Sequence, residues 1–229
     1  MYKFLLFDAD ETIFDFLRAE KTALKLAFGD CNIPFKEEYV PVYSKMNADL
    51  WRRLERKEIT KPELLNMRFA NFYEAMGFEG NPDEMRISYQ KRLGEQCFLL
   101  PGAFELLENL SKTHKLYLIT NGLKTTQSSR LSRSGILPFL SGVFISEEVG
   151  YEKPDRRYFE KVKEAIPGFK EEEAVVIGDS LTSDILGGNN AGIKTVWFNP
   201  KGKANNTKAE PYWTIKKLED IYTFLESGK

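Results

Sequence analysis

The chain has 229 residues, enough for one large domain or for a core with a smaller inserted domain. Hydrophobic residues make up 42% and charged residues 29%, and the formal net charge is -1, which gives no sign of a basic surface for polymeric nucleic acid. No apolar stretch reaches the length of a bilayer-spanning helix, and acidic residues interrupt the first apolar run too early for a secretory signal. The composition therefore predicts a cytoplasmic protein without membrane association.

Five short apolar runs predict buried β-strands. They cover residues 3–7, 115–119, 143–145, 174–177 and 194–198, and each is followed by a polar or glycine-containing turn. Near-continuous apolar strands are typical of a sheet that is covered on both faces. Between the later strands apolar residues recur at helical spacing, as at Phe104, Leu107 and Leu110. This alternation predicts an α/β fold with a parallel sheet.

The segment between the first two strands has no strand pattern. Its residues 16–96 are rich in Lys, Arg, Glu and Leu, and prolines divide it into several predicted helices, at Pro34, Pro41, Pro62 and Pro82. The segment is much longer than a crossover connection requires. We therefore expect a core of residues 1–15 and 97–229 and an inserted helical domain of residues 16–96. Near the C-terminus, residues 201–211 predict a loop and residues 215–225 a last helix.

Polar side chains follow the predicted strands at the points where the strands end. In chain order they are Asp8 and Asp10 after the first strand, Thr120 and Asn121 after the second, Lys153 after the third, and Asp179 and Asp184 after the fourth. Ligands bind beyond the carboxyl ends of the strands in an open α/β sheet. We therefore expect these side chains to converge on one crevice.

The acidic residues of this set suit phosphoryl transfer. The carboxylates of Asp8 and Asp179, with a backbone carbonyl near Asp10, are the hard oxygen ligands that Mg²⁺ prefers. Attack by Asp8 on a phosphate ester would form an aspartyl-phosphate and divide one difficult displacement into two. Asp10 could then protonate the leaving oxygen and later deprotonate the hydrolytic water.

The remaining candidates supply donors and positive charge. Thr120 and Lys153 offer a hydroxyl and an ammonium group for the phosphoryl oxygens, on which transition-state charge spreads. Asp184 could support the metal site or orient Lys153. The single histidine, His114, stands before the second strand, at the wrong end for catalysis, so a histidine-rich zinc site and a two-histidine phosphatase are excluded.

In order and spacing, these residues resemble the motifs of the haloacid dehalogenase superfamily. The motifs are FDADET at residues 7–12, TNG at 120–122, EKP at 152–154, and GDS at 178–180 followed by Asp184. The resemblance implies a Rossmann-like three-layer core with a helical cap of the C1 type inserted after the first motif. It implies that Asp8 is the nucleophile and Asp10 the general acid and base. It also implies the ligand sets: Thr120, Asn121 and Lys153 for phosphate, and Asp8, Asp10 through its carbonyl, Asp179 and Asp184 for Mg²⁺.

Glu11 departs from the family pattern, because many members have glycine at this position of the first motif. Glycine tolerates strained backbone angles that glutamate resists, so the geometry of this turn is open. The DADET sequence and the size and position of the cap are most similar to the pyrimidine 5'-nucleotidases. This narrower resemblance implies a nucleoside 5'-monophosphate as the small phosphomonoester substrate.

Several alternatives share part of this chemistry. A sugar phosphate or an N-acylneuraminate 9-phosphate is the second choice of substrate. A 2-haloacid dehalogenase would use the same nucleophile, but by family resemblance such enzymes lack the second acid, which is present here as Asp10. A phospho-acceptor module without enzymatic activity is disfavoured, because such modules carry no helical insert after the first strand and are much shorter than this chain. A binding protein without enzymatic activity is disfavoured by the intact pair of Asp8 and Asp10. The sequence does not predict the oligomeric state.

Overall fold

The computed structural model describes residues 2–227, and the chain divides into two compact units. One unit is formed by the segment up to Asp15 together with the segment from Cys97 onward, and the other by Phe16–Gln96. Among residues 2–227, no helix combines the length and the apolarity that crossing a membrane requires.

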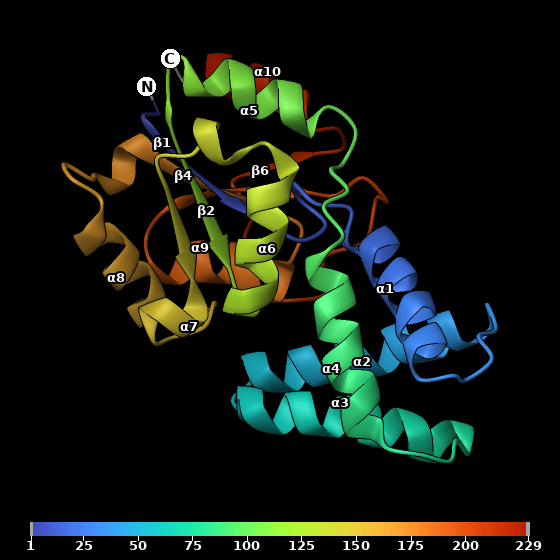
Figure 1. The fold of residues 1–229 in the computed structure, drawn as a ribbon. Helices are drawn as coiled ribbons and strands as arrows, with labels where there is room; N and C mark the ends of the chain where they lie inside the picture. Colours follow the sequence, from blue (N-terminus) through green and yellow to red (C-terminus); the bar gives the residue numbers. More distant parts are fainter. Residues whose placement is uncertain (1, 228–229) are drawn as a thin grey trace. The chain divides into compact units, whose positions relative to one another are not determined.

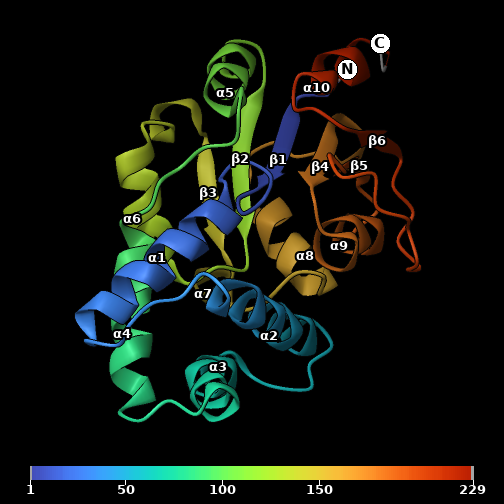
Figure 2. The ribbon, with the colours of Figure 1, turned by 90° about the vertical axis from the view of Figure 1, so that its right-hand side faces the viewer.

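The first unit is built on a six-stranded sheet in which every neighbouring pair is parallel (Figures 1 and 2). The strand order is β3-β2-β1-β4-β5-β6. The bounds are β1 Phe4–Asp8, β2 Lys115–Thr120, β3 Gly142–Ile145, β4 Ala174–Gly178, β5 Lys194–Phe198 and β6 Trp213–Ile215. The five predicted strands are confirmed, and β1 lies between β2 and β4, so the carboxyl ends of these three strands are adjacent.

Helices cover both faces of this sheet. Alternate residues of a strand point to opposite faces, and those of β1 are buried on both. The helices of this unit are α5 Ala103–Ser111, α6 Lys124–Ser134, α7 Ser146–Val149, α8 Arg156–Ala165, α9 Leu186–Asn190 and α10 Asp220–Ser227. Leu5 and Phe7 of β1 pack in a cluster with residues of α5, α6 and α10, whereas Phe4 and Leu6 pack with residues of α8 and of the connection between α9 and β5. The three-layer α/β fold predicted from the sequence is confirmed.

The predicted last helix is wrong in its first part. Instead of a helix over residues 215–225, the chain forms β6, which ends at Ile215 and pairs with β5, and the helix begins only at Asp220. The Asp220 carboxylate accepts hydrogen bonds from the backbone N–H groups of Lys216 and Lys217, at 3.1 and 2.9 Å, a contact back to the preceding residues that is typical of the first turn of a helix. A three-residue strand is too short to show an alternating pattern.

The second unit consists of four helices, α1 Phe16–Asp30, α2 Tyr39–Glu55, α3 Lys61–Met76 and α4 Pro82–Gly94. Its centre is aromatic, and the rings of Phe28, Tyr43, Phe69, Phe72 and Tyr89 pack at centroid distances of 5.1 to 6.5 Å.

Three of the four prolines of the second unit lie at a helix start or between helices, as expected, and Pro34 is in the connection between α1 and α2. Pro62 and Pro82 lie at the beginnings of α3 and α4, which are capped by the side chains of Thr60 and Asn81. Pro41 was expected to separate helices but lies within the first turn of α2, where its missing N–H removes no helical hydrogen bond.

Candidate active site

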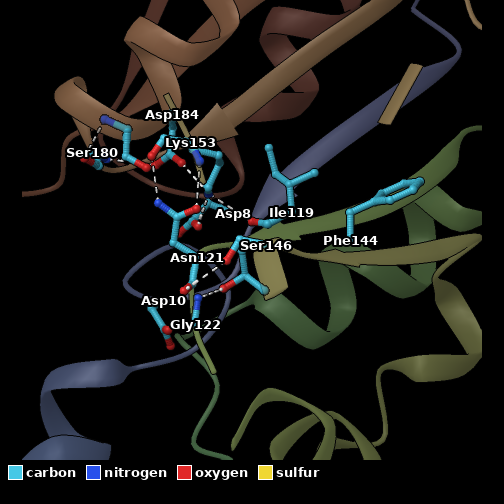
Figure 3. A network of polar contacts seen from close by, with 12 residues as sticks. Asp8, Asp10, Ile119, Asn121, Gly122, Phe144, Ser146, Lys153, Ser180 and Asp184 are labelled. Carbon is cyan, nitrogen blue, oxygen red and sulfur yellow. Dashed lines mark hydrogen bonds and ion pairs between the residues drawn. The ribbon is translucent and has the colours of Figure 1, made fainter. Parts of the chain in front are cut away.

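The adjacent carboxyl ends of β1, β2 and β4 bring the predicted residues together. Asp8 ends β1 and pairs in register with Ile119 of β2, whose next residue is Thr120. On the other side, Phe7 pairs with Ile177 of β4, which ends one residue before Asp179. Figure 3 shows the resulting polar network around Asp8. The topology of the sheet therefore assembles the site.

Lys153 lies at the centre of this network and is almost completely buried. Its ammonium nitrogen, Nζ, lies 2.7 Å from Oδ1 of Asp8, 2.6 Å from Oδ1 of Asp184 and 3.0 Å from the Ile119 carbonyl oxygen (Figure 3). An ammonium group has three hydrogens to donate. All three are engaged, so Lys153 is fixed in place between two carboxylates.

Asn121 fixes the backbone from which Lys153 projects. Its Oδ1 accepts a hydrogen bond from the Lys153 N–H and its Nδ2 donates one to the Lys153 carbonyl, both at 2.8 Å. Both functional ends of the side-chain amide thus contact one residue. The structure places Asn121 in support of Lys153, and its direct contact with phosphate stays a prediction.

Three carboxylates gather beside this lysine. One oxygen from each of Asp8, Asp179 and Asp184 lies within 4.8 Å of the others. Asp184 is held by the backbone N–H of Ser180, 3.1 Å from Oδ2, and it passes so close to Gly178 that a side chain at that position would meet Oδ2 at 2.3 Å. The glycine that ends β4 is therefore required for the approach of Asp184.

The charges of this cluster oppose one another. Burial and the neighbouring charge of Asp184 raise the pKa of Asp8 to about 7, although Lys153 acts in the opposite direction. Burial and the charges of Asp184 and Asp8 also raise the pKa of Asp179 well above its usual range. For Lys153, burial lowers the pKa, but the two carboxylates outweigh it and the net pKa is raised. Three carboxylates gathered beside the Lys153 ammonium group form a donor set that suits a divalent cation.

Asp10 lies two residues beyond Asp8, and its carboxylate has different partners. Its two oxygens contact Arg130 and Gln127 of α6, and the Gln127 contact measures 2.8 Å. Both α6 residues are buried, at 0% and 1% exposure. The sequence did not indicate them, because α6 begins KTTQSSR, a polar segment in which a buried glutamine or arginine looks like any solvated residue.

The structure also shows where three further residues lie, Glu11, Ser180 and His114. Glu11 has φ of 59°, so it adopts the left-handed conformation that favours glycine. The Ser180 side chain accepts a hydrogen bond from the Ser183 N–H at 3.2 Å, as expected of a helix cap. His114 precedes β2, at the strand end opposite Thr120.

Comparison with known proteins places the chain in a family. The haloacid dehalogenase-like hydrolase family matches residues 2–192. The chain belongs to this family. It is 41% identical over 228 residues to pyrimidine 5'-nucleotidase PynA of Streptococcus pneumoniae, covering 99% of this chain and 96% of the relative. It is 33% identical over 224 residues to pyrimidine 5'-nucleotidase YjjG of Escherichia coli, covering 98% of each.

A solved structure of the same family supports the assignment. The crystal structure of the HAD-hydrolase YfnB from Bacillus subtilis, bound to magnesium, superimposes with a TM-score of 0.93 at 42% identity and covers 98% of both chains. The family resemblance inferred from the four motifs is thereby confirmed, and the chain is an enzyme of this hydrolase family.

Proposed function

We propose that the protein is a Mg²⁺-dependent phosphatase that hydrolyses nucleoside 5'-monophosphates through an aspartyl-phosphate on Asp8. The observation that carries the proposal is the position of Asp8. It ends the central strand, with its carboxylate held by Lys153 and grouped with Asp179 and Asp184. In this proposal the unit of residues 1–15 and 97–229 is the catalytic core, and residues 16–96 form the cap.

The proposed reaction has two steps. An oxygen of the Asp8 carboxylate attacks phosphorus, and the bond to the ester oxygen breaks as Asp10 donates a proton to the departing alkoxide. A nucleoside leaves, and Asp8 carries the phosphoryl group. Water then attacks phosphorus while Asp10 takes one of its protons. The bond to Asp8 breaks, which releases inorganic phosphate and restores the carboxylate.

The chain's own residues prepare Asp8 for this attack. Only the ionised carboxylate is nucleophilic, and burial disfavours that form by raising the pKa of Asp8 to about 7. The ammonium group of Lys153, 2.7 Å away, favours the ionised form. For the phosphoryl oxygens we assign the hydroxyl of Thr120 as a donor and the ammonium group of Lys153 as a fixed positive charge.

The cation site in this proposal consists of Asp8, Asp179 and the backbone carbonyl of Asp10, with Asp184 assisting. The acidic cluster fits this role because two of its three carboxylates, those of Asp8 and Asp184, are buried on either side of the Lys153 ammonium group. Bound Mg²⁺ would neutralise phosphate charge and keep Asp8 ionised. The magnesium in the related Bacillus structure supports the choice of metal.

The choice of substrate rests on the relatives. Two proteins that are 41% and 33% identical over nearly the whole chain are named pyrimidine 5'-nucleotidases. This supports a pyrimidine nucleoside monophosphate as the preferred ester. A sugar phosphate is the competing substrate, since it would use the same core chemistry.

The proposal is tested by measuring phosphate release from a panel of pyrimidine and purine nucleoside monophosphates, ribose 5-phosphate and other sugar phosphates. We expect Mg²⁺-dependent release that is fastest for pyrimidine nucleotides, is abolished by chelation, and falls roughly 10⁴-fold in Asp8→Asn. Circular dichroism establishes that the variant is folded. Equal rates for ribose 5-phosphate and every nucleotide would contradict the nucleotidase assignment, and normal turnover by Asp8→Asn would contradict the phosphatase mechanism.

A further inference from the structure

Arg130 of α6 is a buried cation whose position is determined on several sides. Its guanidinium carbon lies 4.3 Å from the centroid of the Phe14 ring, a cation–π contact. Its Nη1 contacts Oδ1 of Asp10 and lies 3.3 Å from Oε1 of Gln127. A buried arginine is costly unless its charge is paired. The pairing with Asp10 therefore restricts both side chains to one arrangement.

Gln127, one helical turn before Arg130, connects two proposed functional groups. Its Nε2 donates to Oδ2 of Asp10 at 2.8 Å and to Oγ1 of Thr120 at 3.1 Å. A glutamine amide has two N–H hydrogens. Each is used by one of these contacts, while Oε1 accepts from Arg130, so the partners fix which end of the amide faces which group.

This arrangement determines the polarity of the Thr120 hydroxyl. Oγ1 accepts from Gln127 and also from the Gly122 backbone N–H, at 3.0 Å. A hydroxyl oxygen has two lone pairs and one hydrogen. With both lone pairs occupied, the hydroxyl can act toward a third partner only as a donor, which is the role that a phosphoryl oxygen requires.

We propose that Gln127 and Arg130 are positioning residues for catalysis. They hold the Asp10 carboxylate in the orientation for proton transfer, and Gln127 orients the Thr120 hydroxyl as a donor to phosphate. The inference rests on the proposed function, because it gives a purpose to Asp10 and Thr120 in a phosphatase. The competing explanation is that the two residues only hold α6 against the turn that follows β1, through Asp10 and Phe14.

The leaving group of the substrate separates the two explanations. A nucleoside leaves as a strongly basic alkoxide and needs a proton from Asp10, whereas p-nitrophenolate is a weak base and leaves without one. The value of kcat/KM reports the steps up to departure of the leaving group. A residue that positions Asp10 therefore affects kcat/KM for nucleotides far more than for p-nitrophenyl phosphate.

The experiment measures kcat/KM on both esters for wild type, Arg130→Met, Arg130→Lys and Gln127→Met, with Asp10→Asn as the reference for complete loss of the acid. The matched control is Arg133→Met, since Arg133 is exposed on the same helix. Arg130→Met should lower the nucleotide value roughly 100-fold and the p-nitrophenyl phosphate value less than about threefold. Arg130→Lys should recover part of the loss, and Arg133→Met should match wild type.

Gln127→Met supplies a second, independent readout without removing a charge. It should show the same dependence on the leaving group and also weaken competitive inhibition by inorganic phosphate roughly tenfold, because Thr120 loses its orientation. Arg130→Met should leave phosphate inhibition unchanged.

Two outcomes would decide against the inference. Losses of the same size on both esters, in variants whose melting temperatures match wild type, would overturn positioning while leaving the phosphatase intact. Activity on neither ester in wild type would overturn both proposals. If Arg130→Met does not fold, the neutral Gln127→Met variant decides, since it keeps the buried charge pair.

Discussion

Replacing the proposed nucleophile should make the metal-free protein more stable. Asp8 is buried, and its pKa rises from 3.8 to about 7, chiefly through burial and the nearby charge of Asp184. Between these two values the folded state holds a proton that the unfolded state has released. The free energy of unfolding of the wild type therefore decreases as the pH rises through this interval, and the loss is complete above about pH 7.

The size of the effect follows from the same values. At pH 8 the raised pKa of Asp8 lowers the free energy of unfolding by about 4 kcal/mol relative to a neutral side chain, and at pH 5, where folded Asp8 is still protonated, by about 1.5 kcal/mol. Asp8→Asn removes the charge but keeps an oxygen that can accept from Lys153. In the presence of EDTA it should therefore be more stable than wild type, with an advantage at pH 8 that exceeds the one at pH 5 by about 2.5 kcal/mol.

Urea denaturation at the two pH values measures this difference. Glu226→Gln, an exposed change on α10, is the control and should alter neither value. Adding Mg²⁺ should stabilise the wild type more than Asp8→Asn and so reduce the gap. An advantage of Asp8→Asn that is the same at both pH values, or a less stable variant, would refute the electrostatic reasoning.

Substitutions at three further positions test the surroundings of Asp8. Lys153→Met leaves Asp8 and Asp184 without their shared cation. Urea denaturation should show that the free energy of unfolding falls by about 3–5 kcal/mol, and kcat should fall roughly 100-fold or more. Unchanged stability would refute the pairing. Gly178→Ala places a methyl group against the Asp184 carboxylate. It should reduce the free energy of unfolding by about 1–3 kcal/mol, seen as a lower melting temperature, and should also reduce activity. Glu11→Gly should keep the free energy of unfolding within about 1 kcal/mol of wild type and retain activity. Glu11→Val should lose about 1–2 kcal/mol in the same urea assay, because the backbone at position 11 has a φ of 59°, which a β-branched residue resists. Equal stability of the two variants would contradict the backbone argument.

The sequence predicted the parts of the fold that leave a periodic signal. The five longer strands are continuous apolar runs, and the polar residues at their ends could be placed together by the rules of parallel sheets alone. β6 could not be predicted, because three residues carry no period and its position depends on pairing with β5. The expectation for Pro41 was wrong because, in the sequence alone, a proline in the first turn of a helix cannot be distinguished from one that ends a helix.

The candidate site was predictable to the extent that its residues follow strands. Asp8 and Asp179 occupy such positions, and their proximity in the structure follows from the strand order. Gln127 and Arg130 do not, because their importance depends on which face of α6 is buried against Asp10. A single polar helix without an apolar stripe does not reveal that face.

The most direct test of the account is to look for phosphate on Asp8. Asp10→Asn is mixed with Mg²⁺ and p-nitrophenyl phosphate, which can phosphorylate the enzyme without a proton donor, and the reaction is quenched in acid. Because the variant lacks the base for the second step, mass spectrometry of its peptides should find a phosphoryl group on Asp8. Release of p-nitrophenol over many turnovers with no phosphate on Asp8 at any time would contradict the account.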